Sequence, residues 1–343
     1  MIEWRVYFEA KDEALGQSLW IREKRKKMKQ LFNYAHVPSH MADLGSEDEL
    51  RQFLKSLDLA GIELFLYENR AELLRYLSSM VGVHLRFWPC WLDFWLGNRR
   101  EVLKSMSPQE ICEHYGGRGT SEDWLTEIRE NLRLAASVKP EYLIWHVSES
   151  SAEEVFQGRY RNSSKVVVRE VANIFNEVAD EVPESVQVLF ENIWHPGLDL
   201  TDPWVVEDFF SRLNRKNIGI MMDTGHLMLT NPKIRYEQEG IDYVIERIEA
   251  LGSLKSLIRG IHLTCSLEEG KEREKAEKVG DIATPMEVMK YISTLDQHRA
   301  FGNCRLKKLI ELVEPKYLVH ELNYREIEEL RGLIKSQQKC LAY

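Results

Sequence analysis

Eight short apolar runs alternate with helical stretches through most of this chain, and that alternation is the strongest constraint on its fold. The runs cover residues 31–36, 61–66, 81–87, 142–147, 186–191, 218–222, 258–263 and 317–320. Because helical patterns separate the runs, successive strands need crossover connections and should pair in parallel. Eight such units favour closure into a (β/α)8 TIM barrel over an open, doubly wound sheet. We therefore predict an α/β protein with a TIM barrel domain over residues 31–343.

Two segments depart from the regular alternation. Residues 1–30 form an N-terminal extension, which we expect to pack on the barrel, and 13–30 read as a helix with a basic face. The seventh βα connection is long, with a charged loop at 268–278 and helices at 285–295 and 305–312. Residues 88–117 predict a loop with one short helix. The other predicted helices cover 46–57, 70–79, 121–137, 165–181, 202–213, 240–254 and 325–335.

Composition restricts where this protein works and what it binds. No apolar run approaches the roughly 20 residues that span a bilayer, and the N-terminus has no signal-peptide pattern. The five cysteines are scattered without a CxxC pair, and this pattern argues against a disulfide framework and against a thiolate zinc site. It favours a cytoplasmic protein. A net charge of −9 argues against a nucleic-acid partner. The oligomeric state stays open, a homo-oligomer included.

The predicted strands end in acids and histidines. The sixth run stops at Asp223, and Thr224-Gly225-His226 follows. The side chains that stand at or just after the other runs, or in the long seventh connection, are His36, His84, His146, Glu191, His262, Asp296, His298 and Glu321. Carboxyl ends of parallel barrel strands converge on one mouth. We therefore expect these residues to share a small volume, although any one histidine taken alone is more often a hydrogen-bonded core residue.

Several carboxylates in one small volume repel each other, and one would have to remain protonated unless a cation joins them. Carboxylate oxygens and imidazole nitrogens without a thiolate suit zinc, manganese, cobalt or magnesium. The pattern thus predicts a divalent metal centre at the barrel mouth.

The segments 190–192, 222–226, 260–263 and 320–321 resemble the xylose-isomerase-like TIM barrels, which include sugar-phosphate isomerases, epimerases and endonuclease IV. The resemblance implies one divalent ion held by Glu191, Asp223, His262 and Glu321. The endonuclease branch of the family implies further ligands and up to three ions; the candidates are His84, His146, His226, Asp296 and His298. The residues after His146 (147–149) and after His262 (264–266) depart from the family pattern.

The favoured function is a metal-dependent isomerase or epimerase of a sugar or sugar-like polyol. A metal-bound carbonyl would acidify the neighbouring carbon, with Glu191 and Glu321 exchanging its proton and His226 orienting the substrate. The expected substrate contacts are His36, Arg86, Trp88, Trp145 and Trp194. Two alternatives remain: a trinuclear zinc phosphodiesterase like endonuclease IV, and a non-catalytic ligand-binding barrel.

Overall fold

The computed structural model describes residues 28–35, 44–71, 77–267 and 291–342. Three sequence predictions lie outside these ranges: the N-terminal extension up to residue 27, His36, and the charged loop at 268–278. The predicted helix at 285–295 is described only from residue 291, where it is helical as far as residue 295.

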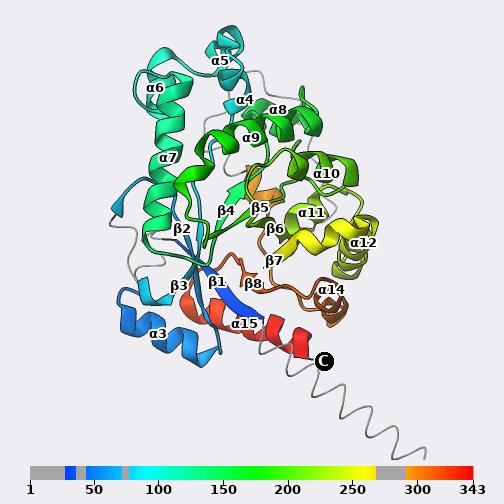
Figure 1. The fold of residues 1–343 in the computed structure, drawn as a ribbon. Helices are drawn as coiled ribbons and strands as arrows, with labels where there is room; N and C mark the ends of the chain where they lie inside the picture. Colours follow the sequence, from blue (N-terminus) through cyan, green and yellow to red (C-terminus); the bar gives the residue numbers. More distant parts are fainter. Residues whose placement is uncertain (1–27, 36–43, 72–76, 268–290, 343) are drawn as a thin grey trace, which may run out of the picture.

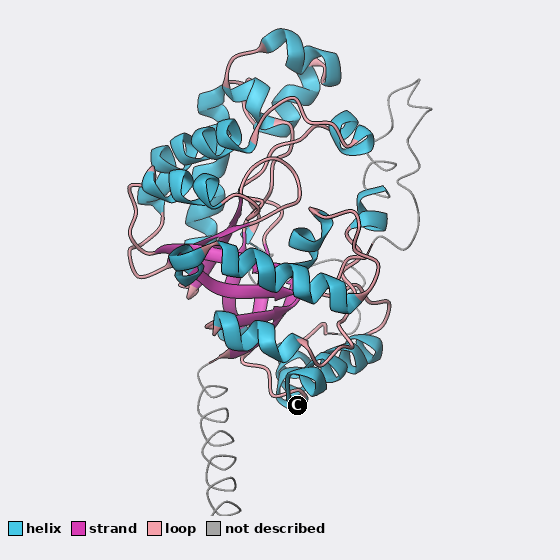
Figure 2. Ribbon diagram, turned by 90° about the vertical axis from the view of Figure 1, so that its right-hand side faces the viewer, coloured by secondary structure: helices cyan, strands magenta, loops and turns pink. Residues whose placement is uncertain are grey.

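Eight strands close into one parallel barrel in sequence order, as predicted (Figure 2). The first strand pairs with both the second and the last, so the cylinder has no free edge. The strands are β1 Lys29–Ala35, β2 Gly61–Phe65, β3 Met80–His84, β4 Tyr142–His146, β5 Gln187–Glu191, β6 Ile218–Asp223, β7 Ile258–Leu263 and β8 Tyr317–His320.

Helices lie outside the cylinder, and Figure 1 shows α4, α5, α6 and α8 gathered at its upper end in that view. The α-helices are α3 Glu47–Ser56, α4 Trp91–Trp95, α5 Arg99–Ser105, α6 Pro108–Tyr115, α7 Ser121–Ser137, α8 Ala152–Gln157, α9 Ser164–Val178, α10 Pro203–Ser211, α11 Thr224–Leu229, α12 Glu237–Ala250, α14 Leu306–Val313 and α15 Ile327–Ala342. Within the described residues, 3-10 helices cover Leu77–Ser79, Ala179–Glu181 and Gly252–Leu257. No helix of the described segments has both the length and the apolarity to cross a membrane.

Several local predictions need correction. The segment after β3 contains three short helices, α4 to α6, where we predicted one. The short helices α8 and α11 were not predicted at all. The helix predicted at 121–137 is α7, and its N-cap is Thr120, because the Thr120 hydroxyl accepts a hydrogen bond from the Asp123 amide while the Asp123 carboxylate accepts one from the Thr120 amide. In the predicted helix at 70–79, the described end is a 3-10 turn at Leu77–Ser79.

A small apolar layer fills the barrel interior below its carboxyl-terminal mouth. Its buried members are Leu31, Tyr142, Ile144, Leu189, Met221, Tyr317 and Val319. Side chains alternate between the two faces of a strand, so residues two positions further along point into the same interior. By this alternation, the next inward-facing side chains of these strands lie directly above the apolar layer, where they form the candidate site.

Candidate metal centre

Strand periodicity delivers the predicted ligands to the barrel interior. Glu191 lies two residues beyond Leu189, Asp223 two beyond Met221, and Glu321 two beyond Val319. Strand register then sets their height, because β4 pairs His146 with Glu191 and β6 pairs Asp223 with His262. The side chains that meet there form three adjoining groups: His84, His146 and Glu191; Glu191, Asp223, His262 and Glu321; and His226, Asp296 and His298.

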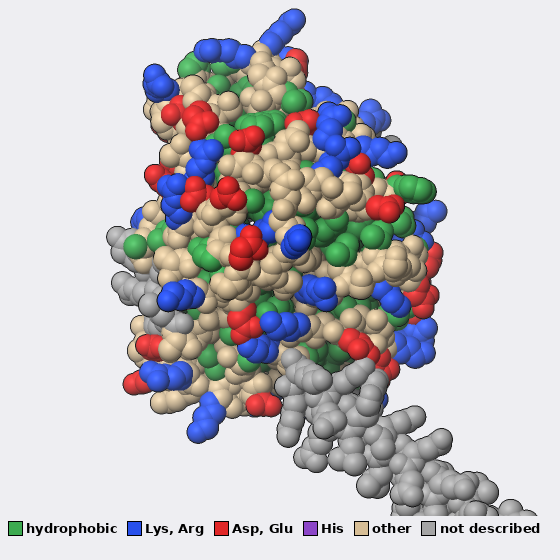
Figure 3. All heavy atoms as spheres, in the orientation of Figure 1, with side chains coloured by type: hydrophobic (Ala, Val, Ile, Leu, Met, Phe, Trp, Pro, Cys, Tyr) green, Lys and Arg blue, Asp and Glu red, His purple; other side chains and the backbone are tan. Residues whose placement is uncertain are grey.

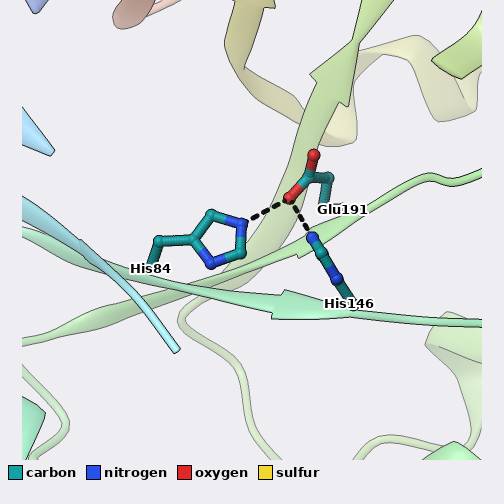
Figure 4. A group of neighbouring side chains, drawn as sticks. All are labelled: His84, His146 and Glu191. Carbon is teal, nitrogen blue, oxygen red and sulfur yellow. Dashed lines mark hydrogen bonds and ion pairs between the residues drawn. The ribbon is translucent and has the colours of Figure 1, made fainter. Parts of the chain in front are cut away.

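Glu191 belongs to two of these groups, and each of its carboxylate oxygens serves a different one. Oε2 lies 3.0 Å from His84 Nε2 and 2.8 Å from His146 Nε2 (Figure 4). Oε1 lies 3.1 Å from His262 Nδ1. Glu191 is 1% exposed, so this bridging position is closed to bulk water.

The second group gathers three carboxylates around one imidazole. His262 Nδ1 lies 2.9 Å from Glu321 Oε2 as well as near Glu191. Asp223 Oδ1 accepts the backbone amide of His226 at 2.5 Å, but the buried Asp223 Oδ2 has no hydrogen-bond partner in the described part of the chain. A buried carboxylate oxygen without a donor is costly, and a cation would satisfy it. These oxygen and nitrogen atoms therefore fit a divalent ion.

The third group depends on two segments that are distant in sequence. His226 sits in α11, which begins directly after β6, and Asp296 and His298 lie in the connection before α14. Asp296 Oδ2 lies 3.2 Å from His226 Nε2 and 2.7 Å from His298 Nε2. His226 Nδ1 is also 3.5 Å from Glu191 Oε1, so this group adjoins the other two.

The groups perturb one another's protonation. Burial raises the pKa of Asp223 to about 7, and the nearby Glu321 and Glu191 carboxylates add to the rise although His226 opposes it. Burial alone would lower the pKa of His262, but the Glu63, Glu321 and Glu191 carboxylates hold it well above its usual range. The mutual repulsion expected from the sequence is thus present, and Asp223 is the acid that retains a proton near neutral pH.

Two residues at the site were missed by sequence reasoning. Asn192 links the end of β5 to β6. Its side chain donates a hydrogen bond to the Asp223 carbonyl at 3.0 Å and accepts one from the Asp223 amide at 2.9 Å. Glu63 is fully buried in β2 and contacts His262 Nε2 at 3.0 Å. The available signal for Glu63 was a single charged residue inside an otherwise apolar run.

The predicted substrate contacts separate into two places. Arg86, Trp88 and Trp145 line a cavity of ≈ 40 Å³ next to His146, which has room for water but not for a sugar ring. In this cavity the Arg86 guanidinium stacks on Trp88, and Trp145 packs edge-on against Phe175 of α9. Trp194 differs, because its ring lies 5.1 Å from that of His226 and borders an open cavity of ≈ 270 Å³.

Not every strand-end polar residue belongs to the centre. His320 points away from the barrel interior and contacts Gln30 and Gln337, and burial lowers its pKa to about 3. It is therefore a neutral, hydrogen-bonded core histidine. Cys265 is 1% exposed in the apolar core and belongs to none of the three groups.

Fold and site together define a class: a closed (β/α)8 barrel that carries buried clusters consistent with divalent metal binding at the carboxyl ends of its strands. A family model described as "Xylose isomerase-like TIM barrel" matches residues 116–335, and the chain belongs to this family. Most members of this superfamily are metal-dependent enzymes. No curated protein matches the sequence.

Solved structures with a similar fold include a candidate xylose isomerase from Rhodospirillum rubrum, with 13% identity, a TM-score of 0.55, and coverage of 92% of this chain and 98% of that one. A D-tagatose 3-epimerase-like protein has 15% identity, a TM-score of 0.51, and coverage of 92% and 98%. Endonuclease IV from Thermus thermophilus has 13% identity, a TM-score of 0.48, and coverage of 92% and 99%. At these identities the likeness concerns the fold alone.

Proposed function

We propose that this protein is a hydrolase of phosphate esters that works with three divalent ions, one in each of the three groups. The sequence alone favoured an isomerase with one ion. The geometry favours the hydrolase because Glu191 offers one oxygen to each of two groups and His226 joins a third group beside it. An isomerase needs only the second group, which would leave the clustering of His84, His146, Asp296 and His298 without a role.

The bridging position of Glu191 is the observation that carries this proposal. Bound divalent ions would supply charge neutralisation for a phosphate and a water acidic enough to attack at neutral pH. The water oxygen would bond to phosphorus while the ester P–O bond breaks, and the alcohol would leave with a proton. Burial tends to raise the pKa of Glu191, but His262 and His146 hold it well below its usual range, so this carboxylate stays ionised.

The substrate that this site fits best is a small phosphate ester of a sugar-like compound. Trp194, whose ring lies 5.1 Å from that of His226, borders a cavity of ≈ 270 Å³ that Asp199 and Thr230 also line, and this cavity would suit a polar ring stacked on an aromatic face. Acidic and basic side chains are interspersed on the face shown in Figure 3, and the net charge is −9. Both features support a small substrate over a nucleic acid, whose phosphates need a basic surface.

Metal content tests the proposal first. Protein reconstituted with zinc, freed of loose metal and measured by plasma mass spectrometry should contain close to three ions per chain. A His298→Ala variant should lose one of them, because it removes a ligand from the third group only. Lys233→Ala changes an exposed residue outside the three groups, so it serves as the matched control and should keep all three ions.

Hydrolysis tests it second. The zinc-loaded protein should release phosphate from sugar monophosphates, or p-nitrophenol from bis-p-nitrophenyl phosphate, and Glu191→Gln should abolish the release. A chain that binds three ions yet leaves every phosphate ester intact would refute the hydrolase. Cleavage of duplex DNA in preference to small esters would refute the proposed substrate class.

The isomerase remains the second candidate, supported by one observation. The group of Glu191, Asp223, His262 and Glu321 is a complete four-ligand site by itself, and both glutamates approach the same imidazole nitrogen. One ion per chain, with metal-dependent proton exchange from a ketose that Glu321→Gln removes, would establish it. A chain that binds no ion would instead support the non-catalytic barrel.

A further inference from the structure

We propose that Glu63 is a positioning residue for the metal centre. Its carboxylate accepts the Nε2 proton of His262 and so keeps the Nδ1 lone pair of that ring directed at the ion held with Glu191 and Glu321. The inference rests on the metal-binding part of the proposed function, and not on hydrolysis.

The two nitrogens of His262 serve opposite sides of the ring. Nε2 lies 3.0 Å from Glu63 Oε1 and 3.1 Å from Oε2. Nδ1 lies 3.1 Å from Glu191 Oε1 and 2.9 Å from Glu321 Oε2. A histidine that donates one N–H to a carboxylate presents its other nitrogen in the neutral, metal-binding form, and its ring orientation is fixed by the same bond.

Hydrogen-bond donors from three strands surround the Glu63 carboxylate. Besides His262, the Tyr142 hydroxyl donates to Oε2 at 2.8 Å and the Asn33 amide donates to Oε1 at 3.2 Å. Three donors from β1, β4 and β7 thus converge on a side chain of β2. Both oxygens of Glu63 therefore have hydrogen-bond donors, and the side chain is held in one orientation beside His262.

The backbone of β3 also leaves room for Tyr142, one of these donors. A Cβ added at Gly82 would lie 2.2 to 2.6 Å from the Tyr142 ring and hydroxyl, a rigid group that cannot easily retreat. Glycine at this position of β3 therefore allows Tyr142 to cross the barrel interior towards Glu63. An apolar residue at position 63 would fill a barrel core at lower cost, since burying a polar side chain costs free energy unless it is hydrogen-bonded. The expense indicates a task for Glu63 beyond packing.

The test is the zinc affinity of each site, measured by chelator competition on the full chain. Glu63→Gln keeps the volume and one acceptor oxygen but removes the charge. It should lower the affinity for one of the three zinc ions 10- to 100-fold, as loss of an outer partner of a metal-binding histidine typically does. The affinities for the other two ions should stay unchanged. The matched control is Glu170→Gln, a buried glutamate on α9 whose partners Trp95 and Asn173 lie outside the three groups. It should bind all three ions as the wild type does.

A second measurement needs only the wild type and so does not depend on the variant folding. Nitrogen NMR of the zinc-loaded, histidine-labelled protein should show His262 with its proton on Nε2 and zinc on Nδ1. Zinc on Nε2, or equal affinities in wild type and Glu63→Gln, would overturn the inference while leaving the metal centre intact. A wild-type chain that binds no zinc would overturn the metal centre itself, which is a distinguishable result.

Discussion

Replacing Asp223 with asparagine should stabilise the metal-free protein while destroying its metal binding. Asp223 is completely buried, and one of its oxygens has no hydrogen-bond partner among the described residues. Burial and the neighbouring carboxylates raise its pKa from 3.8 to about 7. An asparagine would keep an oxygen for the His226 amide and carry no charge.

The sign follows from which state holds the proton. The folded protein binds the Asp223 proton more tightly than the unfolded chain does, so this residue lowers stability as the pH rises from about 4 to about 7. At 1.36 kcal/mol per pKa unit, the cost is about 2 kcal/mol at pH 5 and about 4 kcal/mol at pH 8. The Asp223→Asn variant escapes this cost, and its advantage over the wild type should therefore grow with pH.

Urea unfolding of both proteins in the presence of a chelator, at pH 5 and pH 8, measures the effect. We expect the variant to be the more stable protein at both values, with the larger gap at pH 8. Added zinc should reverse the order, because the amide is a poor ligand. The exposed Asp180→Asn variant is the control and should follow the wild type. A metal-free Asp223→Asn protein that is less stable than the wild type at pH 8 would falsify the electrostatic reasoning.

Two further predictions concern the scaffold. Gly82→Ala should cost about 1–3 kcal/mol in urea unfolding, because its Cβ would overlap the Tyr142 ring in a packed interior. Thr120→Ala should cost about 1 kcal/mol, because it removes the hydroxyl that caps α7, and Thr126→Ala on an exposed turn of the same helix is the comparison that should cost less.

The barrel was predictable because its signal is repeated eight times. The limits of β7 and β8 agree with the predicted ones, and every other strand lies within three residues of its predicted ends. Only one of the three short helices after β3 was predicted, and α8 after β4 was missed, because five to eight residues give too little periodicity to recognise. The start of α6 was nevertheless readable, since Ser107-Pro108 followed by Glu110 is a capping box with proline at the first helical position.

The clustering of the candidate ligands was predictable for a different reason, which also explains what was missed. Strand ends meet at one mouth whatever the details of packing, so Glu191 and Asp223 could be placed together from their positions alone. Glu63 could not, because its partner His262 lies 199 residues away and its role depends on which face of β2 it occupies. The sequence likewise did not separate Trp145, which packs outward from β4 against α9, from Trp194, which lies in the loop after β5 beside His226.

At the proposed metal centre, protons and metal ions would compete for the same atoms. Burial opposes a positive charge on His226, but Asp223 and Asp296 hold its pKa well above its usual range, and the carboxylate of Asp296 raises that of His298 to about 10. These imidazoles therefore carry the charge that offsets the buried acids when no ion does so. Each ion that binds must displace such protons, so metal uptake should strengthen as the pH rises. The same ion pairs that stabilise the buried acids in the metal-free fold would thus set the pH above which metal ions bind.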